Sequence, residues 1–204
     1  MTAQKSGIRS AVVHLEVDET HTICIRSIGK DDEGRLREGI AALSPRSRYL
    51  RFMSVAPTPP DQVIDRLLDV DGEHHLAWGA IDMNDADRPA MGAVHAIRSD
   101  KSGEVDMSVA VLDRYQEAGV GTLLTAVLLV DCHAHGIEVL QAQTLAENDA
   151  AVRFLFRLGG ERLSTSSGVS EFRLEVEPAL ARLRSNPRSR ALSDLFSQLA
   201  PYLD

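Results

Sequence analysis

The segment Asp113–Thr122 joins a strand-like stretch to a helix-like stretch and carries two closely spaced glycines, Gly119 and Gly121. Before it, Glu104–Leu112 alternates apolar and polar side chains, which is typical of a strand. After it, Val120–His135 repeats apolar residues every three or four positions, which is typical of a helix. A glycine-rich turn of this kind leaves the first N–H groups of the helix free, and such groups bind phosphate well. The chain therefore needs a fold in which a strand leads directly into a helix, with a possible anion site between them.

Strand and helix patterns continue on both sides of this connection. Upstream, strand-like runs are joined by short polar turns, which is typical of antiparallel neighbours. Downstream, the next strand is reached through a helix, so it should run parallel to the strand before the glycines. We therefore predict an α/β (α+β) fold with a mixed, mostly antiparallel sheet flanked by helices. The expected strands cover residues 22–26, 75–81, 91–97, 104–112 and 137–143, the helices 31–43, 61–68, 120–135 and 148–158, and a final hairpin 162–176.

The two ends of the chain lie outside this pattern. Residues 1–20 show little periodicity and are expected to form a loosely held arm, which leaves one domain at 21–177 and a helical extension at 178–204. Four apolar residues of the extension share one helical face. This stripe is expected to dock on its own domain, with pairing to a second copy in a homodimer as the alternative. The stripe comprises Leu192, Leu195, Phe196 and Leu199.

The composition limits the classes of function. The chain has 204 residues and a formal net charge of −8, so nucleic acid, which usually binds a basic face, is not an expected partner. An acidic protein attracts cations, which favours an amine as partner. The longest apolar run, Leu123–Val130, is too short to cross a membrane, and the two cysteines cannot form a disulfide framework. With no secretory signal visible, we expect a cytoplasmic protein.

Other polar groups are interpreted as structural. The cysteine and two histidines of Cys132–His135 could suggest a metal site, but on a helix these histidines point to different faces and no second ligand cluster follows at a suitable spacing. No metal is therefore expected. His75 and His95 are interpreted as strand residues, and the three arginines of Pro45–Arg51 as a solvated helix face.

Read as Gln-x-x-Gly-x-Gly, the segment Gln116–Gly121 resembles the pyrophosphate loop of the GNAT acyltransferases. A dinucleotide-binding fingerprint would need a glycine in place of Leu124, and the Gly-Lys-Ser/Thr of a Walker loop is absent. The order of elements over residues 22–176 is also similar to the GNAT fold. The resemblance implies a twisted sheet that is splayed at its central parallel pair of strands.

The resemblance also implies acetyl-CoA as cosubstrate. Its pyrophosphate would lie on the N–H groups of the loop, and its pantetheine arm would bond to the backbone of the preceding strand. Asn148 would contact the pantetheine, although its side chain equally suits a helix N-cap. The implied cofactor-binding residues are Val109, Ala110, Val111, Gln116, Glu117, Ala118, Gly119, Val120, Gly121, Thr122 and Asn148.

The reaction implied is direct transfer of the acetyl group to a primary amine. Only a small fraction of lysine is neutral at pH 7, so a general base is useful. GNAT enzymes often have a glutamate ten residues before the loop glutamine, and this chain has Asp106 there, whose shorter side chain can act through a water. A surface carboxylate without function is the alternative for Asp106, and Glu104 is the second candidate base. A backbone N–H near Val109 would meet the oxyanion.

Two further features concern the leaving group and the acceptor. The tyrosine that protonates the leaving thiolate in many GNAT enzymes is replaced by Leu155, but a thiol with a pKa of about 8.5 can leave without a strong acid. Ser44–Phe52 resembles a stretch of the GNAT domains of bacterial protein-lysine acetyltransferases. A protein lysine is therefore favoured as acceptor over a small-molecule amine. Because Asp106 and Leu155 depart from the family pattern, a non-catalytic acyl-CoA-binding module is the alternative.

Overall fold

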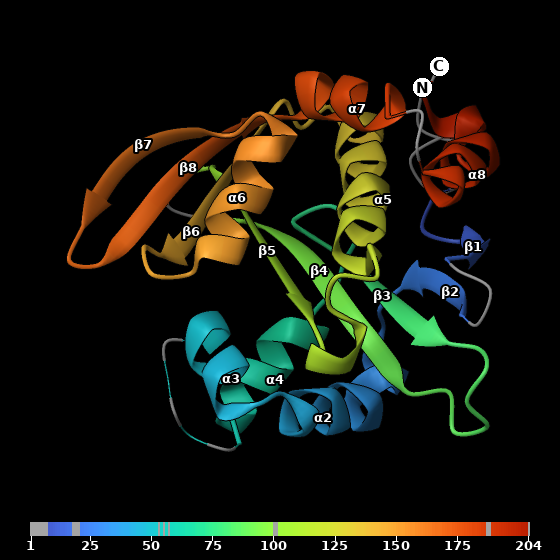
Figure 1. Ribbon diagram of the computed structural model, residues 1–204, viewed down its shortest axis with the longest axis horizontal. Helices are drawn as coiled ribbons and strands as arrows, with labels where there is room; N and C mark the ends of the chain where they lie inside the picture. Colours follow the sequence, from blue (N-terminus) through green and yellow to red (C-terminus); the bar gives the residue numbers. More distant parts are fainter. Residues whose placement is uncertain are drawn as a thin grey trace.

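The computed structural model describes residues 8–17, 21–52, 54, 56, 58–99, 102–186 and 189–203. Within these residues the strands are β1 (Val12–Glu16), β2 (Thr22–Ser27), β3 (His75–Asp82), β4 (Ala90–Arg98), β5 (Val105–Val111), β6 (Val139–Leu145), β7 (Glu161–Ser166) and β8 (Val169–Glu175). They form one sheet in the order β1-β2-β3-β4-β5-β6-β8-β7 (Figure 1). Neighbouring strands run antiparallel except β5 and β6, which are parallel. The predicted mixed, mostly antiparallel sheet is confirmed.

Helices flank this sheet, as predicted. They are α2 (Glu33–Ala42), α3 (Pro45–Phe52), α4 (Asp61–Leu68), α5 (Val120–Ala134), α6 (Asp149–Leu158), α7 (Val176–Arg184) and α8 (Arg190–Gln198), with short 3-10 turns η1 (Lys30–Asp32), η2 (Asp113–Tyr115) and η3 (Ala200–Tyr202). None of the helices in the described part of the chain combines the length and the apolar character that crossing a bilayer requires.

The helices form two groups, one on each face of the sheet. Figure 1 shows α2, α3 and α4 gathered together, apart from α5, α6 and α7. The side chain of Leu124 on α5 lies against Gly92 on β4. Ile40 of α2 and Ile64 of α4 instead cluster with Ala77 of β3, whose side chain points to the opposite face because side chains alternate along a strand. The sheet is therefore a central layer with a separate layer of helices on each side.

Helix α5 is buried on almost every side, although its sequence pattern predicts one apolar face. Helices α7 and α8 pack against it: Leu180 of α7 and Leu195 of α8 belong to the same buried cluster as α5. The prediction that the stripe of the C-terminal extension docks on its own domain is confirmed, since Leu195 and Leu199 are fully buried. The extension thus completes the core around α5.

The expectation of a loosely held arm at residues 1–20 is wrong for the part that the structure describes. Strand β1 extends the sheet beyond β2, and Val13 and Leu15 are buried. Helix α8 fastens this strand: Gln198 Nε2 donates to the carbonyl oxygen of His14 at 2.9 Å, and the His14 N–H donates to Gln198 Oε1 at 3.3 Å. Five residues are too short a pattern to reveal a strand whose partner helix lies about 180 residues later.

The closing hairpin forms as predicted but with longer strands. Strands β7 and β8 meet at a two-residue turn, Ser167–Gly168, in which both residues have positive φ. Such a turn matches the twist of the flanking strands and allows them to pair close to its tip. The stretch Ser164–Ser166 therefore belongs to β7.

Candidate active site

Strands β5 and β6 separate soon after they meet (Figure 1). Within the described residues they pair at Asp106 with Gln141 and at Met107 with Ala142, and at no later position. From residue 108 onward, β5 is paired with β4 alone. The sheet therefore has the gap that the resemblance implied, with the unpaired edge of β5 as one wall.

The backbone of β5 offers bonding groups to this gap at alternate residues. The Leu112 N–H donates to the Met91 carbonyl on β4 at 2.9 Å, so Leu112 directs its backbone toward β4. Two residues earlier, Ala110 has the same direction, which agrees with its carbonyl oxygen lying close to Gly92. Val109 and Val111 must then direct their N–H and C=O groups toward β6. Of the three residues expected to bond the pantetheine, these two face the gap.

The loop after β5 has an unusual backbone. Glu117 and Gly119 both have positive φ, of 67° and 83°. This conformation is natural for Gly119, whereas a glutamate rarely adopts it. Gln116 Nε2 donates to the Val111 carbonyl at 3.1 Å and so holds the loop on the end of β5. The loop Gln116–Gly121 is thus attached to the end of β5.

Helix α5 begins with N–H groups that nothing in the described protein binds. Gly119 is the N-cap and has no side chain to cap the helix, and its carbonyl accepts from the N–H groups of Thr122 and Leu123. The N–H groups of Val120 and Gly121 have no partner among the described residues. Together with the positive end of the helix dipole, these groups suit a diphosphate. The loop residues therefore fit the pyrophosphate of acetyl-CoA.

The C-terminal extension reaches the same loop. Ala118, Gly119 and Thr122 line a hollow together with Ser189 and Arg190 at the start of α8. The Arg190 side chain is 85% exposed and its Nε lies 3.7 Å from Asp194 Oδ2, so this arginine beside the loop is already paired with a carboxylate. Sequence reasoning missed this neighbour because the two segments are about 70 positions apart in the chain.

The last core helix, α6, carries two of the expected site positions. Asn148 Oδ1 accepts from the Ala151 N–H at 3.2 Å, so the side chain does serve as the N-cap of α6. A contact with pantetheine stays a prediction. Leu155, at the position of the usual tyrosine acid, is buried against Ala142 and Phe172. This position therefore presents no proton donor to the gap.

Asp106 is the first paired residue of β5 with its side chain on the face opposite α5. It lies in a groove with Asp69, Asp71, Arg66 and His75. Partial burial, and secondarily the charge of nearby Glu104, raise the pKa of Asp106 above its ordinary value. An exposed carboxylate with a raised pKa is a better base near neutral pH than an ordinary aspartate.

A row of polar side chains beside Asp106 was missed by sequence reasoning. His75 Nε2 lies 2.9 Å from His95 Nδ1, and His95 is opposite Ser108 in the pairing of β4 with β5. Arg51 of α3 donates from Nη2 to Ser108 Oγ at 2.8 Å. Burial, together with the neighbouring His75 and Arg51, lowers the pKa of His95 to about 3, so this imidazole is neutral. The histidines are strand residues, as interpreted, and His95 lies on the same face of the sheet as Asp106.

The interpretation of Pro45–Arg51 as a solvated face is wrong for Arg51. Arg46 does fit it, since its side chain is 58% exposed and pairs with Glu147 at 3.3 Å. Arg51, five positions later, turns toward the sheet and lines a cavity. The helix face that holds Arg51 is set by the packing of α3 beside β5 and β6, which the local sequence does not reveal.

This cavity of about 90 Å³ lies between the helices α2, α3 and α4 and the sheet. Its walls are mostly apolar, with side chains such as Ile28, Leu36 and Ile40. Small residues on the sheet, Ala93 and Ala110, leave room for it. This volume is smaller than that of sites for drug-sized molecules, so the cavity suits only a small ligand. The cavity adjoins β5 on the same face as Asp106.

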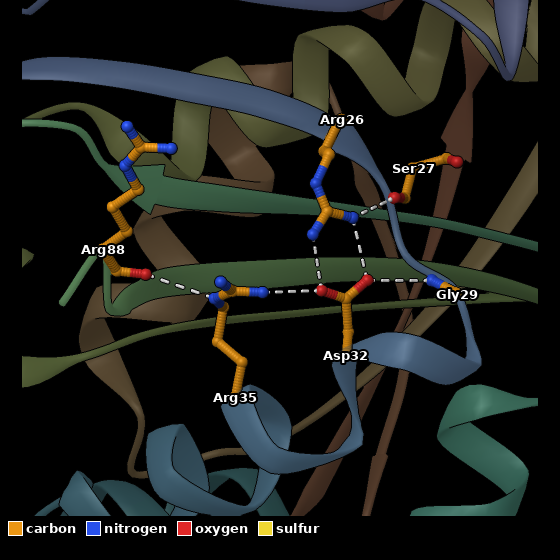
Figure 2. A network of polar contacts seen from close by, with 6 residues as sticks. All are labelled: Arg26, Ser27, Gly29, Asp32, Arg35 and Arg88. Atoms are coloured by element: carbon orange, nitrogen blue, oxygen red, sulfur yellow. Dashed lines mark hydrogen bonds and ion pairs between the residues drawn. The ribbon is translucent and has the colours of Figure 1, made fainter.

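Arginines also line the cavity near the end of β2, where Asp32 joins two of them (Figure 2). Arg26 donates to both oxygens of Asp32, at 2.6 and 2.8 Å, and Arg35 donates to Oδ1 at 2.9 Å. The Gly29 N–H completes the set at 3.0 Å. These partners outweigh the effect of burial and hold the pKa of Asp32 below its ordinary value. Asp32 is thus a fixed anion with its acceptor sites filled.

The possible metal ligands of Cys132–His135 are engaged separately. Cys132 is buried in the core, His133 contacts Glu177, and His135 Nδ1 lies 3.0 Å from Asp131 Oδ1. Among the described residues, no group of three or more histidine, cysteine or acidic side chains is arranged to hold a metal ion.

Comparison with known proteins decides the family. The sequence matches the acetyltransferase (GNAT) family over residues 45–159, which is more than half of the chain and includes β5, the loop and α5. The chain belongs to this family. It is therefore an acyltransferase by family, with acetyl-CoA as the cosubstrate that the family uses.

Individual GNAT relatives agree with this assignment. An acetyltransferase of Pseudomonas aeruginosa is 25% identical over 66% of this chain and 72% of that protein. The acetyltransferase Pat of Mycolicibacterium smegmatis is 26% identical over 76% of this chain, which spans only 46% of that longer protein. Among solved structures, the GNAT domain of S. lividans PAT covers 81% of this chain and 96% of its own length, with a TM-score of 0.71 and 21% identity.

A further GNAT structure contains the cosubstrate. A putative acetyltransferase of Salmonella typhimurium, solved with acetyl-CoA, covers 76% of this chain and 94% of its own, with a TM-score of 0.61 and 16% identity. At this level of identity the likeness concerns the fold.

Proposed function

We propose that this GNAT protein transfers the acetyl group of acetyl-CoA directly to the ε-amine of a protein lysine, with Asp106 as the general base. The main support is the gap between β5 and β6, which ends at the uncapped N-terminus of α5. A strand edge with free backbone groups and a helix start with free N–H groups are what an acyl-CoA needs for its pantetheine and its diphosphate.

The cosubstrate supplies an activated acyl group as a thioester. In the proposal, the N–H groups of Val120 and Gly121 bind the diphosphate, and Gly119 keeps the loop in its left-handed conformation. The backbone groups of Val109 and the N–H group of Val111 hold the pantetheine arm and the thioester oxygen along β5. The Val109 N–H then stabilises negative charge on that oxygen.

Asp106 removes the proton from the attacking amine in this proposal. Its raised pKa favours proton acceptance near neutral pH, and its position on the acceptor face, next to the gap, supports the role. Because aspartate is one methylene shorter than the glutamate usual in the family, the proton passes through a bridging water. The leaving thiolate departs unprotonated or takes a proton from solvent, since Leu155 can donate none.

The acidic groove around Asp106 supports a lysine as acceptor. Asp69, Asp71 and Asp106 contribute three carboxylates to the lining, against the guanidiniums of Arg66 and Arg98. A protonated lysine is attracted to such a groove before it loses its proton. The groove lies at the surface, which suits a side chain presented by another protein.

The experiment is a turnover assay with acetyl-CoA that measures free thiol release in the presence of lysine peptides and of small amines. Mass spectrometry of a cell lysate treated with labelled acetyl-CoA and the protein then identifies the acceptors. Faster thiol release with peptides than with small amines is expected. Release only with small amines would overturn the protein-lysine acceptor.

A non-catalytic acyl-CoA-binding module is the second candidate. It is favoured by Leu155, whose buried side chain cannot act as an acid, and by the aspartate at position 106. Calorimetry separates the two candidates: binding of acetyl-CoA without thiol release across amines and peptides would favour the module.

A further inference from the structure

The cavity under α2, α3 and α4 is positively charged although the protein is acidic. Among its described lining residues are the guanidiniums of Arg26, Arg35 and Arg51 and one carboxylate, that of Asp32. The whole chain has a formal net charge of −8. A local excess of two positive charges in such a protein needs an explanation.

Arg51 is the arginine without an acidic partner. Its described contacts are the hydrogen bond to Ser108 Oγ and the ring of Phe52, whose centroid lies 5.1 Å from the guanidinium carbon. Within the described residues no carboxylate lies within ion-pair distance of Arg51. Burial lowers the pKa of Arg51, and the neutral His95 beside it supplies no negative charge. A half-buried cation without a counter-ion is unfavourable, so an anion that enters the cavity gains a favourable interaction.

The carboxylate of Asp32 is not available to pair with Arg51. Figure 2 shows Asp32 enclosed by Arg26, Arg35 and the Gly29 N–H, so its oxygens are already used. Two guanidiniums share this one carboxylate. The positive charge at Arg51 therefore remains available to a ligand.

The wall near Arg51 is apolar and close to the reacting strand. Phe52, Leu67 and Ala93 are among the neighbouring lining residues. Ser108 and Ala110 point into the same side of the sheet and flank Val109, which faces the gap. A ligand with a short apolar chain and one carboxylate matches both the wall and the charge.

We propose that this cavity binds a small organic carboxylate, with the carboxylate on the Arg51 guanidinium and the apolar chain along the wall. The carboxylate can be the end of an acyl chain on coenzyme A or a free molecule. The first source deepens the proposed function and rests on it, whereas the second does not. In both cases the recognising group is Arg51.

The test measures binding to the full chain by calorimetry with matched probes. Succinyl-CoA and butyryl-CoA have acyl chains of the same length and differ in the terminal carboxylate. Free succinate and neutral succinamide form the second pair. The variants are Arg51→Met, which removes the charge, and Arg51→Lys, which keeps it. Arg37→Met is the control, because Arg37 lies on α2 outside the cavity and pairs with Glu33 and Asp61.

The expected result is a preference of about 10- to 100-fold for the carboxylate member of at least one pair, because hydrogen bonds to charged groups are strong. Arg51→Met should abolish the preference, Arg51→Lys should keep part of it, and Arg37→Met should leave it unchanged. A preference in the coenzyme A pair identifies the acyl chain as the source, and a preference in the free pair alone identifies a free molecule.

The inference is overturned if neither pair shows a preference, or if the preference survives Arg51→Met. It is also overturned if Arg51→Met weakens succinyl-CoA and acetyl-CoA equally, since the effect would then be structural. Failure of acetyl-CoA to bind the unaltered protein would contradict the proposed function instead. Binding of free succinate compared with succinamide would still test the cavity.

Discussion

Replacement of Gly119 by alanine tests whether the left-handed loop conformation is needed for cosubstrate binding. Gly119 has φ of 83°, and a Cβ built on it would meet no atom within 4 Å. The cost of Gly119→Ala is therefore conformational and not steric. For an L-residue the left-handed conformation costs about 1–2 kcal/mol. We expect the free energy of unfolding to fall by that amount, or the melting temperature by roughly 2–8 °C for a chain of this size.

The same substitution should weaken acetyl-CoA binding. If alanine leaves the left-handed conformation, the N–H groups of Val120 and Gly121 turn away from the diphosphate. A loss of about 1.4 kcal/mol corresponds to a tenfold higher Kd. We expect an increase of about tenfold in the acetyl-CoA Kd, measured by calorimetry beside urea unfolding.

Gly121→Ala is the matched control in the same loop. Gly121 lies inside α5 without positive φ, and an added Cβ would lie 3.4 Å from Val111 Cγ2, an ordinary contact. Alanine favours a helix over glycine by up to about 1 kcal/mol, so this variant should be as stable as the parent or more so. Equal loss of binding in both variants would show that crowding at the phosphate, and not the backbone conformation of Gly119, is responsible. Unchanged stability and unchanged Kd in Gly119→Ala would refute the reasoning altogether.

Three other predictions concern the base, the buried histidine and the extension. Asp106→Asn should lower kcat by roughly 10²- to 10⁴-fold. The unaltered protein should lose activity as the pH falls through the pKa of Asp106, which is raised above the ordinary aspartate value. Unchanged turnover in the variant would exclude Asp106 as the base. The pKa of His95 is depressed to about 3 from an ordinary value of about 6.5, so its contribution to stability is complete above pH ~6.5 and is lost as the pH falls toward 3. His95→Gln should flatten that part of the pH dependence in chemical denaturation, and an identical slope would contradict the assignment. Leu195→Ala should lower the free energy of unfolding, measured by urea denaturation, by about 2–5 kcal/mol, because the Leu195 side chain is fully buried. A loss below about 0.5 kcal/mol would mean that α8 is not part of the folded core.

The loop and its two neighbouring elements could be predicted from the sequence because their signals are local. Strand alternation before Asp113, glycine at position 119 and helical periodicity after it each depend on residues a few positions apart. The same holds for the Asn148 N-cap of α6. Backbone conformation at these positions is dictated by the residue itself and its nearest neighbours.

Strand β1 and Arg51 could not be predicted in the same way. Strand β1 is stable because Gln198 and the apolar side chains of α8 cover it, and these lie at the other end of the chain. Arg51 looks like a surface residue in a basic stretch, and only the packing of α3 turns it toward Ser108. Contacts between residues far apart in sequence leave no periodic signal in either segment.

The sequence by itself determined the position of the proposed diphosphate site, because a left-handed glycine and a helix start are properties of a short stretch of backbone. The tertiary structure decided how the acceptor face is charged: it brought three aspartates into the groove at Asp106 and left Arg51 unpaired in the neighbouring cavity. The physical reason is that electrostatic surroundings depend on distances in space between segments, and these distances exist only after the sheet and its helices have packed.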